Sequence, residues 1–156
     1  MSEPFGLPQG EILFTLRGRV TQGKRLGSRL GFPTANIAYD PHSGVWPREG
    51  VYAGVARLDG EARAYVCILN QGRHPTAPEG VATVEAHLLG HAHRDLYGMG
   101  LTLAYCRYLR PERTFATLEA LREQLARDRQ SALQWARERA PALLDGVDAP
   151  PPTHQA

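Results

Sequence analysis

Apolar and polar residues alternate along several short stretches in the first two thirds of this sequence. Between residues 12 and 21, alternate positions hold Ile12, Phe14, Leu16 and Val20, which predicts a strand with one buried face. Further strands are predicted at residues 51–58, 62–69, 81–89 and 99–109. Asp59-Gly60, between two of them, is a strong hairpin signal. With an extended segment at residues 33–36, the pattern gives about six short strands joined by glycine-rich connections.

The pattern changes to three- and four-residue steps near the C-terminus. Thr117 is suited to be an N-cap, and the apolar residues after it predict one long amphipathic helix that stops at Pro141. These apolar residues are Leu118, Leu121, Leu125, Ala132 and Trp135 or Ala136. No helix alternates with the strands, which excludes a doubly wound sheet and favours a mainly β fold, an antiparallel barrel with the helix packed outside.

Length and composition narrow the class of protein. The 156 residues predict one domain, placed at 11–142 between an irregular lead-in at 1–10 and a disordered proline-rich tail at 143–156. A net charge of +2, with acids and bases mixed, does not form the basic stripe of a nucleic-acid binder. Cys67 and Cys106 form no C-x-x-C pair, so neither a zinc site nor a disulfide is predicted. Without a signal peptide or an apolar run of ~18 residues, we expect a soluble, cytoplasmic protein.

A glycine-rich, cationic segment follows the first predicted strand. Its glycines let main-chain N–H groups converge on an anion, and its cations neutralise phosphate charge. The residues concerned are Gly23, Gly27, Gly31, Lys24, Arg25 and Arg29. The spacing is not that of a Walker A motif, so a phosphate-binding loop here would be of another type. The alternative on composition alone is a mobile hairpin loop without a ligand.

Thr34 and Asn36 follow this segment two residues apart. In an extended chain this spacing points both side chains to one face. A hydroxyl and an amide oxygen are hard ligands that suit Mg²⁺, which often shares its ligands with substrate phosphates. The alternative is that Pro-Thr-Ala-Asn is a structural turn.

Glu85 is a carboxylate in the middle of a predicted strand, where glutamate is disfavoured. Alternation puts Ala82, Val84, Ala86 and Leu88 on an apolar face and Glu85 on the opposite face. Two interpretations follow: a solvated outer face, or a general base aimed at a substrate hydroxyl.

Two loops carry further candidate side chains. The long connection at residues 39–50 contains Trp46, which could cover a planar ligand or pack down as a local anchor. The connection at residues 70–80 contains Arg73 and His74, which are either phosphate or ribityl contacts or exposed polar loop residues.

Several short motifs occur together in one order along the chain. They are G-x-V-x-x-G-x-x-x-G with L-G-F-P-T-A-N, then G-V-Y-A at 50–53, N-x-G-x-x-P-T at 70–76, V-E-x-H-L-L at 84–89, Y-G at 97–98 and L-R-P-E-x-x-F before the helix. In this order they resemble riboflavin kinase from about Gly18 to Asp128. The family fold is a six-stranded antiparallel Greek-key barrel with one C-terminal helix, which agrees with the element order predicted from the pattern.

The resemblance implies a reaction and a set of residue roles. The family transfers the ATP γ-phosphoryl group to the 5′-hydroxyl of riboflavin, which gives FMN and ADP and uses Mg²⁺ or another divalent cation. It implies that Thr34 and Asn36 hold the metal and that Glu85 is the base. The phosphate-binding residues implied are Gly23, Lys24, Gly27, Arg29, Gly31, Pro33, Thr34 and Asn36, and the flavin-binding residues are Arg73, Tyr97 and Arg110. We expect a monomer that binds small molecules and neither nucleic acid nor a membrane.

The sequence also departs from the family. Bacterial relatives usually carry this kinase behind an FAD-synthesising adenylyltransferase domain, for which 156 residues leave no room. Gln71 occupies a usually aliphatic position and Ala77 one where an aromatic is common, which predicts an altered flavin-side loop. These departures motivate one alternative, a non-catalytic flavin- or nucleotide-binding barrel module. A generic interaction barrel is the other alternative, and the weak net charge argues against its nucleic-acid-binding form.

Overall fold

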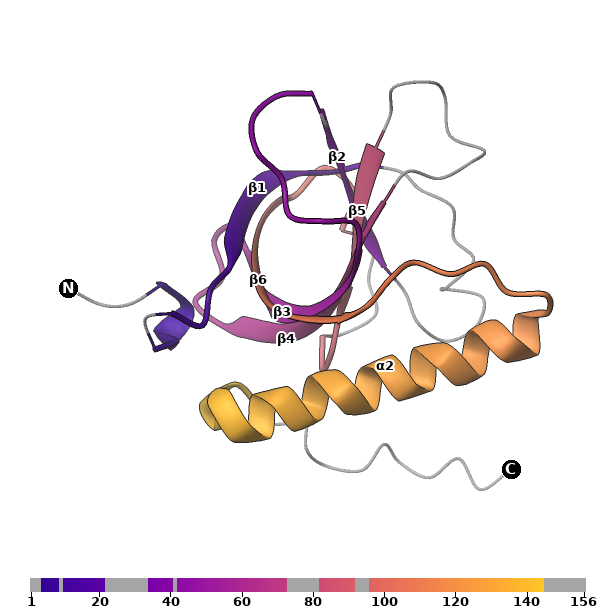
Figure 1. Ribbon diagram of the computed structural model, residues 1–156. Coiled ribbons are helices and arrows are strands. Elements are labelled where there is room, and N and C mark those ends of the chain that lie inside the picture. The colour runs from indigo at the N-terminus through magenta and orange to yellow at the C-terminus, as the bar shows by residue number, and fades with distance from the viewer. Residues whose placement is uncertain are drawn as a thin grey trace.

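Six antiparallel strands close into a barrel in the order β1-β2-β5-β4-β3-β6, with one long helix beside it (Figure 1). The computed structural model describes residues 4–8, 10–21, 34–40, 42–72, 82–91 and 96–144. The strands are Phe14–Thr21 (β1), Ala35–Tyr39 (β2), Gly50–Leu58 (β3), Ala64–Gly72 (β4), Ala82–Leu88 (β5) and Gly100–Arg110 (β6). The chain skips to a non-neighbouring strand after β2 and after β5, and the predicted Greek-key barrel is confirmed.

The observed strands follow the alternating pattern closely. The predicted hairpin at Asp59-Gly60 joins β3 to β4, and Gly60 adopts the positive φ of 83° that such a turn favours. The main difference is at β2, which extends to Tyr39, where a loop was expected to begin. Its pairing with β5 runs from Ala35 to Tyr39 and explains the extension.

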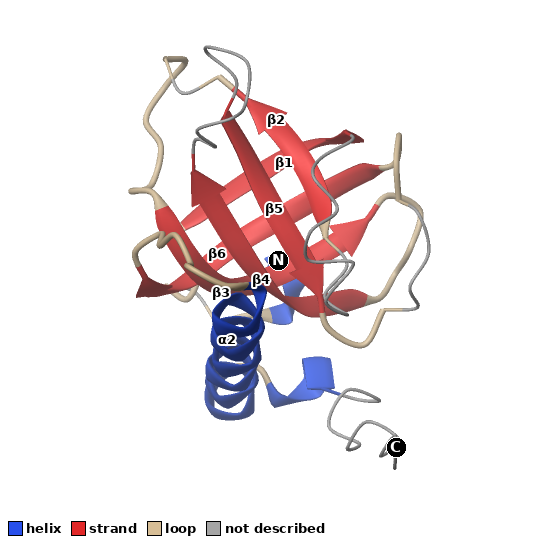
Figure 2. Ribbon diagram, turned by 90° about the vertical axis from the view of Figure 1, so that its right-hand side faces the viewer, coloured by secondary structure: helices blue, strands red, loops and turns tan. Residues whose placement is uncertain are grey.

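Alternate residues of the strands face two different cores. The barrel interior holds residues such as Ile37, Leu69, Val84 and Tyr105. Outward-facing residues of β3, β4 and β6 instead pack against the second half of the helix. This outer core includes Val55, Val66, Ala104, Leu133, Trp135 and Ala136. Figure 1 and Figure 2 show the helix beneath β3 and β4, on one side of the barrel. The helix therefore covers one outer wall of the barrel, as predicted.

The helix α2 runs from Leu118 to Arg139 and begins at the predicted cap, where Thr117 Oγ1 accepts a hydrogen bond of 3.0 Å from the Ala120 N–H. Short 3-10 turns at Pro4–Gly6 (η1) and Pro141–Leu144 (η2) flank the domain. Leu7 and Leu144 are buried in the outer core, so packing extends beyond the predicted bounds of 11–142. Among the described residues, no helix has the length and apolar composition needed to cross a membrane.

Both cysteines are free and buried, and burial is the main reason that their thiols resist ionisation. Burial, with a smaller contribution from Glu11, raises the pKa of Cys106 to about 12. Cys67 lies in the barrel interior, and its pKa is also raised, mainly by burial. They therefore behave as small apolar residues.

Trp46 anchors the connection between β2 and β3. Its ring centroid lies 4.5 Å from that of Tyr39 and 5.2 Å from that of Phe14. Its Nε1 donates a 2.9 Å hydrogen bond to the Ser43 carbonyl. Of the two interpretations of this residue, the structure therefore supports the local anchor.

Gln71 points into the barrel, where its side-chain amide is bonded at both ends. Its Nε2 donates to the Pro47 carbonyl at 2.7 Å, and its Oε1 accepts from the Tyr105 hydroxyl at 2.6 Å. Burial raises the pKa of Tyr105, which keeps this hydroxyl protonated as a donor. The unusual glutamine thus ties the β2–β3 connection to β4 and β6 from inside the barrel.

This internal link predicts a coupled loss of stability. Tyr105→Phe leaves Gln71 Oε1 buried without a donor and should lower the free energy of unfolding by about 1–3 kcal/mol. The double variant Tyr105→Phe/Gln71→Leu should lose less than the sum of the single variants, because neither partner is left behind unpaired. Urea unfolding measures all three, and strictly additive losses would contradict the link.

Candidate functional site

A row of residues crosses the outer wall of the barrel on five consecutive strands. Asn36 on β2 is paired with Glu85 on β5, and Glu85 is paired with Asn70 on β4. Asn70 is in turn paired with Val51 on β3, and Val51 with Arg110 at the end of β6. Residues paired across strands share a face, so these five side chains project from one side of the wall.

This side is the outside of the barrel. The sequence neighbours of Asn36, Glu85 and Asn70 include Ala35, Val84, Ala86 and Leu69, which belong to the interior core. Because successive residues of a strand alternate, the row must point outward. The prediction that Glu85 lies on the face opposite Val84 and Ala86 is confirmed.

A cavity of about 500 Å³ lies over this row, a size typical of small-molecule sites. Its floor is the outer wall of the barrel, lined by Thr34, Val51, Ile68, Asn70, Glu85 and His87. Its other walls are the connection at residues 111–117 and the first half of α2. The carboxylate at position 85 therefore lies at the floor of a partly open cavity.

The helix contributes an apolar wall because its first half stands away from the barrel. Leu118, Leu121 and Leu125 line the cavity, and Leu118 is 57% exposed. Only from Ala132 onward are the apolar residues of the helix buried in the outer core. The amphipathic stripe predicted to pack on the barrel thus does so in its second half, while the first half faces the cavity.

The connection from β6 to α2 forms the remaining wall. Its Glu112 lies against the α-carbon of Gly72 at the end of β4, where any Cβ would overlap the carboxylate. Phe115 lines the cavity, and the guanidinium of Arg113 lies 5.3 Å from the centre of its ring. The glycine of the N-x-G motif therefore lets the connection approach the barrel.

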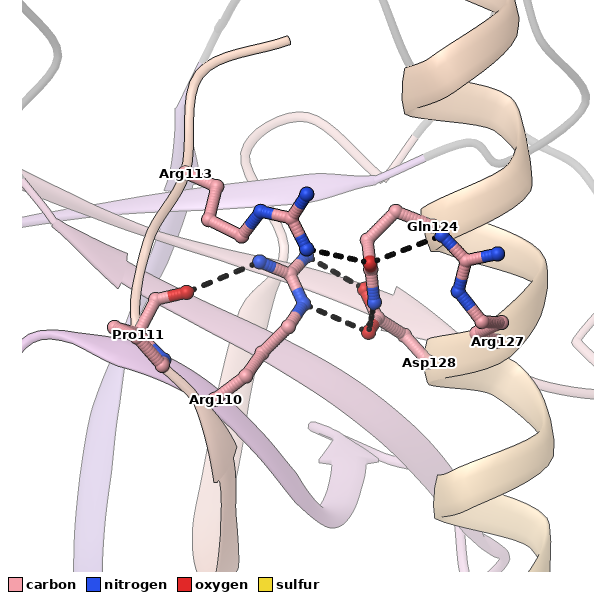
Figure 3. A network of polar contacts seen from close by, with 6 residues as sticks. All are labelled: Arg110, Pro111, Arg113, Gln124, Arg127 and Asp128. Carbon is pink, nitrogen blue, oxygen red and sulfur yellow. Dashed lines mark hydrogen bonds and ion pairs between the residues drawn. The ribbon is translucent and has the colours of Figure 1, made fainter.

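Arg110 and Asp128 join the barrel to the helix at the edge of the cavity. Arg110 Nε and Nη2 donate to the two carboxylate oxygens of Asp128 at 2.8 and 2.7 Å, and the Asp128 side chain is only 3% exposed. Gln124 Nε2 donates to the same carboxylate at 2.9 Å. Figure 3 shows Arg113 and Arg127 both reaching Gln124, whose Oε1 accepts from them at 3.1 and 3.3 Å.

Asn70 carries an unsatisfied acceptor in the cavity floor. Its Oδ1 is buried and has no hydrogen-bond partner among the described residues. A buried oxygen without a donor is costly, so a donor from a bound ligand would satisfy a real deficit. Asn70 stands directly beside Glu85 in the strand register.

Thr34 and Asn36, the predicted metal ligands, lie near Glu85 at the β2 end of the row. Thr34 lines the cavity, and Asn36 stands beside Glu85 on the outer face. The described part of the chain contains no group of three His, Cys, Asp or Glu residues suited to a metal. Hydroxyl and amide oxygens fit a hard cation that completes its shell with phosphate oxygens and water.

The other predicted site residues are only partly covered by the structure. The phosphate-loop residues Gly23, Lys24, Gly27, Arg29, Gly31 and Pro33, as well as Arg73, His74 and Ala77, lie outside the described residues. Tyr97 is 59% exposed in the turn before β6, at the opposite end of that strand from Arg110, and is not among the described residues that line the cavity. Arg110 lines the cavity, but its guanidinium is bonded to Asp128. A flavin contact by Tyr97 or Arg110 stays a prediction.

Sequence reasoning did not identify Asn70 or Asp128 as site residues. For Asp128 a signal was present, because positions 118, 121, 125, 128 and 132 form one helical stripe that is apolar except for the aspartate. For Asn70 the signal was its place at the start of the N-x-G-x-x-P-T motif, but its unpaired oxygen appears only when the wall and the helix are placed together.

The chain is similar in sequence to known riboflavin kinases. A family model described as "Flavokinase: Riboflavin kinase" matches residues 11–136. The bifunctional riboflavin kinase/FMN adenylyltransferase of Pseudomonas fluorescens is 39% identical over 116 residues, which are 74% of this chain and 36% of that protein. The RNA-binding riboflavin kinase RibR of Bacillus subtilis is 34% identical over 113 residues, which are 72% of this chain and 47% of that protein.

A solved structure shares the fold. The riboflavin kinase from Trypanosoma brucei superposes with a TM-score of 0.57 at 23% identity, with 90% of this chain and 89% of that chain covered. The fold is a small closed barrel with a cavity outside its wall, beside the helix. The chain belongs to the riboflavin kinase family. It spans less than half the length of the bacterial relatives named above.

Asn70 and Gln71 offer a matched test of the unsatisfied acceptor. Asn70→Leu removes an oxygen that has no partner, so the free energy of unfolding should stay the same or rise by up to about 1 kcal/mol. Gln71→Leu, at the adjacent position on the opposite face, breaks two hydrogen bonds and should lower it by about 1–3 kcal/mol. Denaturant unfolding compares the two variants. Equal losses would mean that the Asn70 amide is satisfied in solution.

Proposed function

We propose that this chain transfers the γ-phosphoryl group of ATP to the 5′-hydroxyl of riboflavin, forming FMN and ADP, as a cytoplasmic monomer. The observation that carries this function is Glu85, a carboxylate on the floor of a cavity of about 500 Å³ with an apolar wall. Membership of the riboflavin kinase family supports the choice of substrates. The non-catalytic alternative rested partly on Gln71, which is bonded inside the barrel and is not among the described residues that line the cavity.

The cavity offers complementary surfaces to a flavin. Its leucine wall and Phe115 suit the flat, largely apolar ring system. Asn70, Glu85 and Thr34 on the floor suit the hydroxylated ribityl chain. The ring would then lie between the helix and the barrel, and the ribityl chain would lead its 5′-hydroxyl toward Glu85.

In this reaction each polar residue at the floor has a separate role. Glu85 accepts the proton of the 5′-hydroxyl as that oxygen forms its bond to the γ-phosphorus and the bond to the ADP leaving oxygen breaks. Thr34 and Asn36 would hold Mg²⁺, which when bound neutralises charge on the phosphates. Asn70 Oδ1 can accept a hydrogen bond from a ribityl hydroxyl and so fix the chain beside the base.

One assay tests this function directly. The purified chain is incubated with riboflavin, ATP and MgCl₂, and the flavins are separated by chromatography. We expect FMN to accumulate with an equal amount of ADP. Absence of FMN, with riboflavin still bound, would favour the non-catalytic module.

Glu85→Gln tests the proposed base. The change keeps the shape of the side chain but removes the charge and the proton-accepting strength, so turnover should fall by about 10²–10⁴-fold. Binding of riboflavin and of Mg·ATP should largely survive, because the carboxylate acts on the reacting hydroxyl. Glu123→Gln, on an exposed helix position, is the control and should turn over normally. Normal FMN formation by Glu85→Gln would remove the residue from the mechanism.

Asn36→Leu tests the proposed role of Asn36 in binding the metal and the nucleotide. Loss of the amide oxygen should weaken Mg·ATP binding at least about tenfold, while the barrel stays folded and riboflavin still binds. Titration calorimetry with each ligand separates the two effects. Unchanged Mg·ATP affinity in a folded variant would make Pro-Thr-Ala-Asn a structural turn.

A further inference from the structure

Arg110 and Asp128 form a polar link between the barrel and the helix. This link lies at the point where the apolar stripe of the helix would otherwise continue. Leu118, Leu121 and Leu125 lead to Asp128, and apolar packing resumes at Ala132. Asp128 is 3% exposed and its partner Arg110 is 15% exposed, so both charges are largely withdrawn from water. Such a pair is a poor source of stability compared with apolar residues of the same volume. Its presence in the stripe therefore calls for another explanation.

The geometry of the link is specific. The two parallel hydrogen bonds between Arg110 and Asp128 fix both the distance and the relative orientation of the two side chains. Arg110 Nη1 also donates to the Pro111 carbonyl at 3.1 Å. Through Gln124, the same carboxylate is connected to Arg113, which belongs to the connection at 111–117. The end of β6, the connection and the helix are thus held together at one point (Figure 3).

All three of these elements contribute residues to the lining of the cavity. Arg110 ends the row that contains Glu85, Asp128 ends the leucine stripe, and Arg113 holds the connection that carries Phe115. The second half of the helix is fixed by the outer core, but the first half has the cavity beneath it and no such packing. A rigid polar link at this point holds the leucine wall at a set distance from the barrel floor.

We infer that Arg110, Asp128 and Gln124 are positioning residues, which set the width of the cavity for the flavin ring and do not themselves bind it. The inference rests on the proposed function, and it gives Arg110 a different role from the flavin contact predicted from the sequence. Because Arg110 already makes two hydrogen bonds to a carboxylate, Asp128 and Arg110 should act as one unit. Removing either or both should have the same effect on flavin affinity.

The test uses a variant that removes both charges together. Arg110→Met/Asp128→Leu leaves no buried charge unpaired, so the protein should fold with a melting temperature near that of the wild type. The KM for riboflavin should rise at least about tenfold, while the KM for Mg·ATP stays within about twofold. Riboflavin binding, followed by quenching of its fluorescence, should weaken by the same factor. If the pair only stabilised the fold, the double variant would have the same ratio of the KM for riboflavin to the KM for Mg·ATP as the wild type.

The chain offers a matched control and a discriminating single variant. Arg107 and Glu138 form an ion pair of 3.8 Å between the same strand and the same helix, with side chains 41% and 49% exposed. Arg107→Met/Glu138→Leu should keep wild-type kinetics, because an exposed pair contributes little. Arg110→Lys keeps the charge but cannot form two parallel bonds, so its KM for riboflavin should also rise.

The outcomes separate this inference from the proposed function. A wild-type protein that forms FMN, beside a folded double variant with an unchanged KM for riboflavin, would overturn the positioning role alone. Weak riboflavin binding by an Arg110 variant with normal binding by Asp128→Asn would also overturn it, because Arg110 would then contact the flavin directly. A wild-type protein that forms no FMN and binds no riboflavin would overturn the proposed function and the inference with it.

Discussion

The closed six-stranded barrel leaves no space for a ligand in its interior, and the location of the site follows from that constraint. An eight-stranded barrel has room for side chains or at most one small ligand, and six strands enclose less space. Here Tyr52, Leu69 and Tyr105 fill the interior, with the two tyrosine rings 5.0 Å apart. Reactive groups must therefore project from the outer wall. The alternation of the strands achieves this, because each outward position such as Glu85 lies between two interior residues that hold its strand in place.

An outer wall alone would expose the site to water, so a second element has to cover it. The helix does so because its two halves differ. Its second half is held by Leu133, Trp135 and Ala136 in the outer core, while its first half extends over the row that contains Glu85. The polar link at Arg110 and Asp128 marks the boundary between the two halves. Phosphoryl transfer depends mainly on positioning, so a rigid cover of fixed spacing suits the proposed reaction.

The sequence predicted the features that depend on local periodicity and missed those that depend on how elements meet. Alternation alone was enough to place Glu85 opposite Val84, and Thr117 identified the start of the helix. Gln71 was linked to the flavin-side loop, but its strand register turns it into the barrel, where it bonds Tyr105. The cavity could not be predicted, because periodicity does not say where along the helix its packing on the barrel begins. The assignment to a family came from several motifs in one order, not from any single pattern.

Two adjacent residues show how the domain divides its polar groups between stability and function. Gln71 points inward and both ends of its amide are bonded, whereas Asn70 points outward and its Oδ1 has no partner in the described part of the chain. The leucines above Asn70 are likewise not fully buried, and Leu118 is 57% exposed. Both deficits lower the stability of the empty protein, because unpaired buried oxygens and exposed apolar surface are unfavourable. A ligand that brings a donor and a flat apolar ring removes both deficits and binds only the folded state, so its binding free energy adds to that of folding. The incomplete interactions around the cavity are thus the part of the fold that a ligand completes.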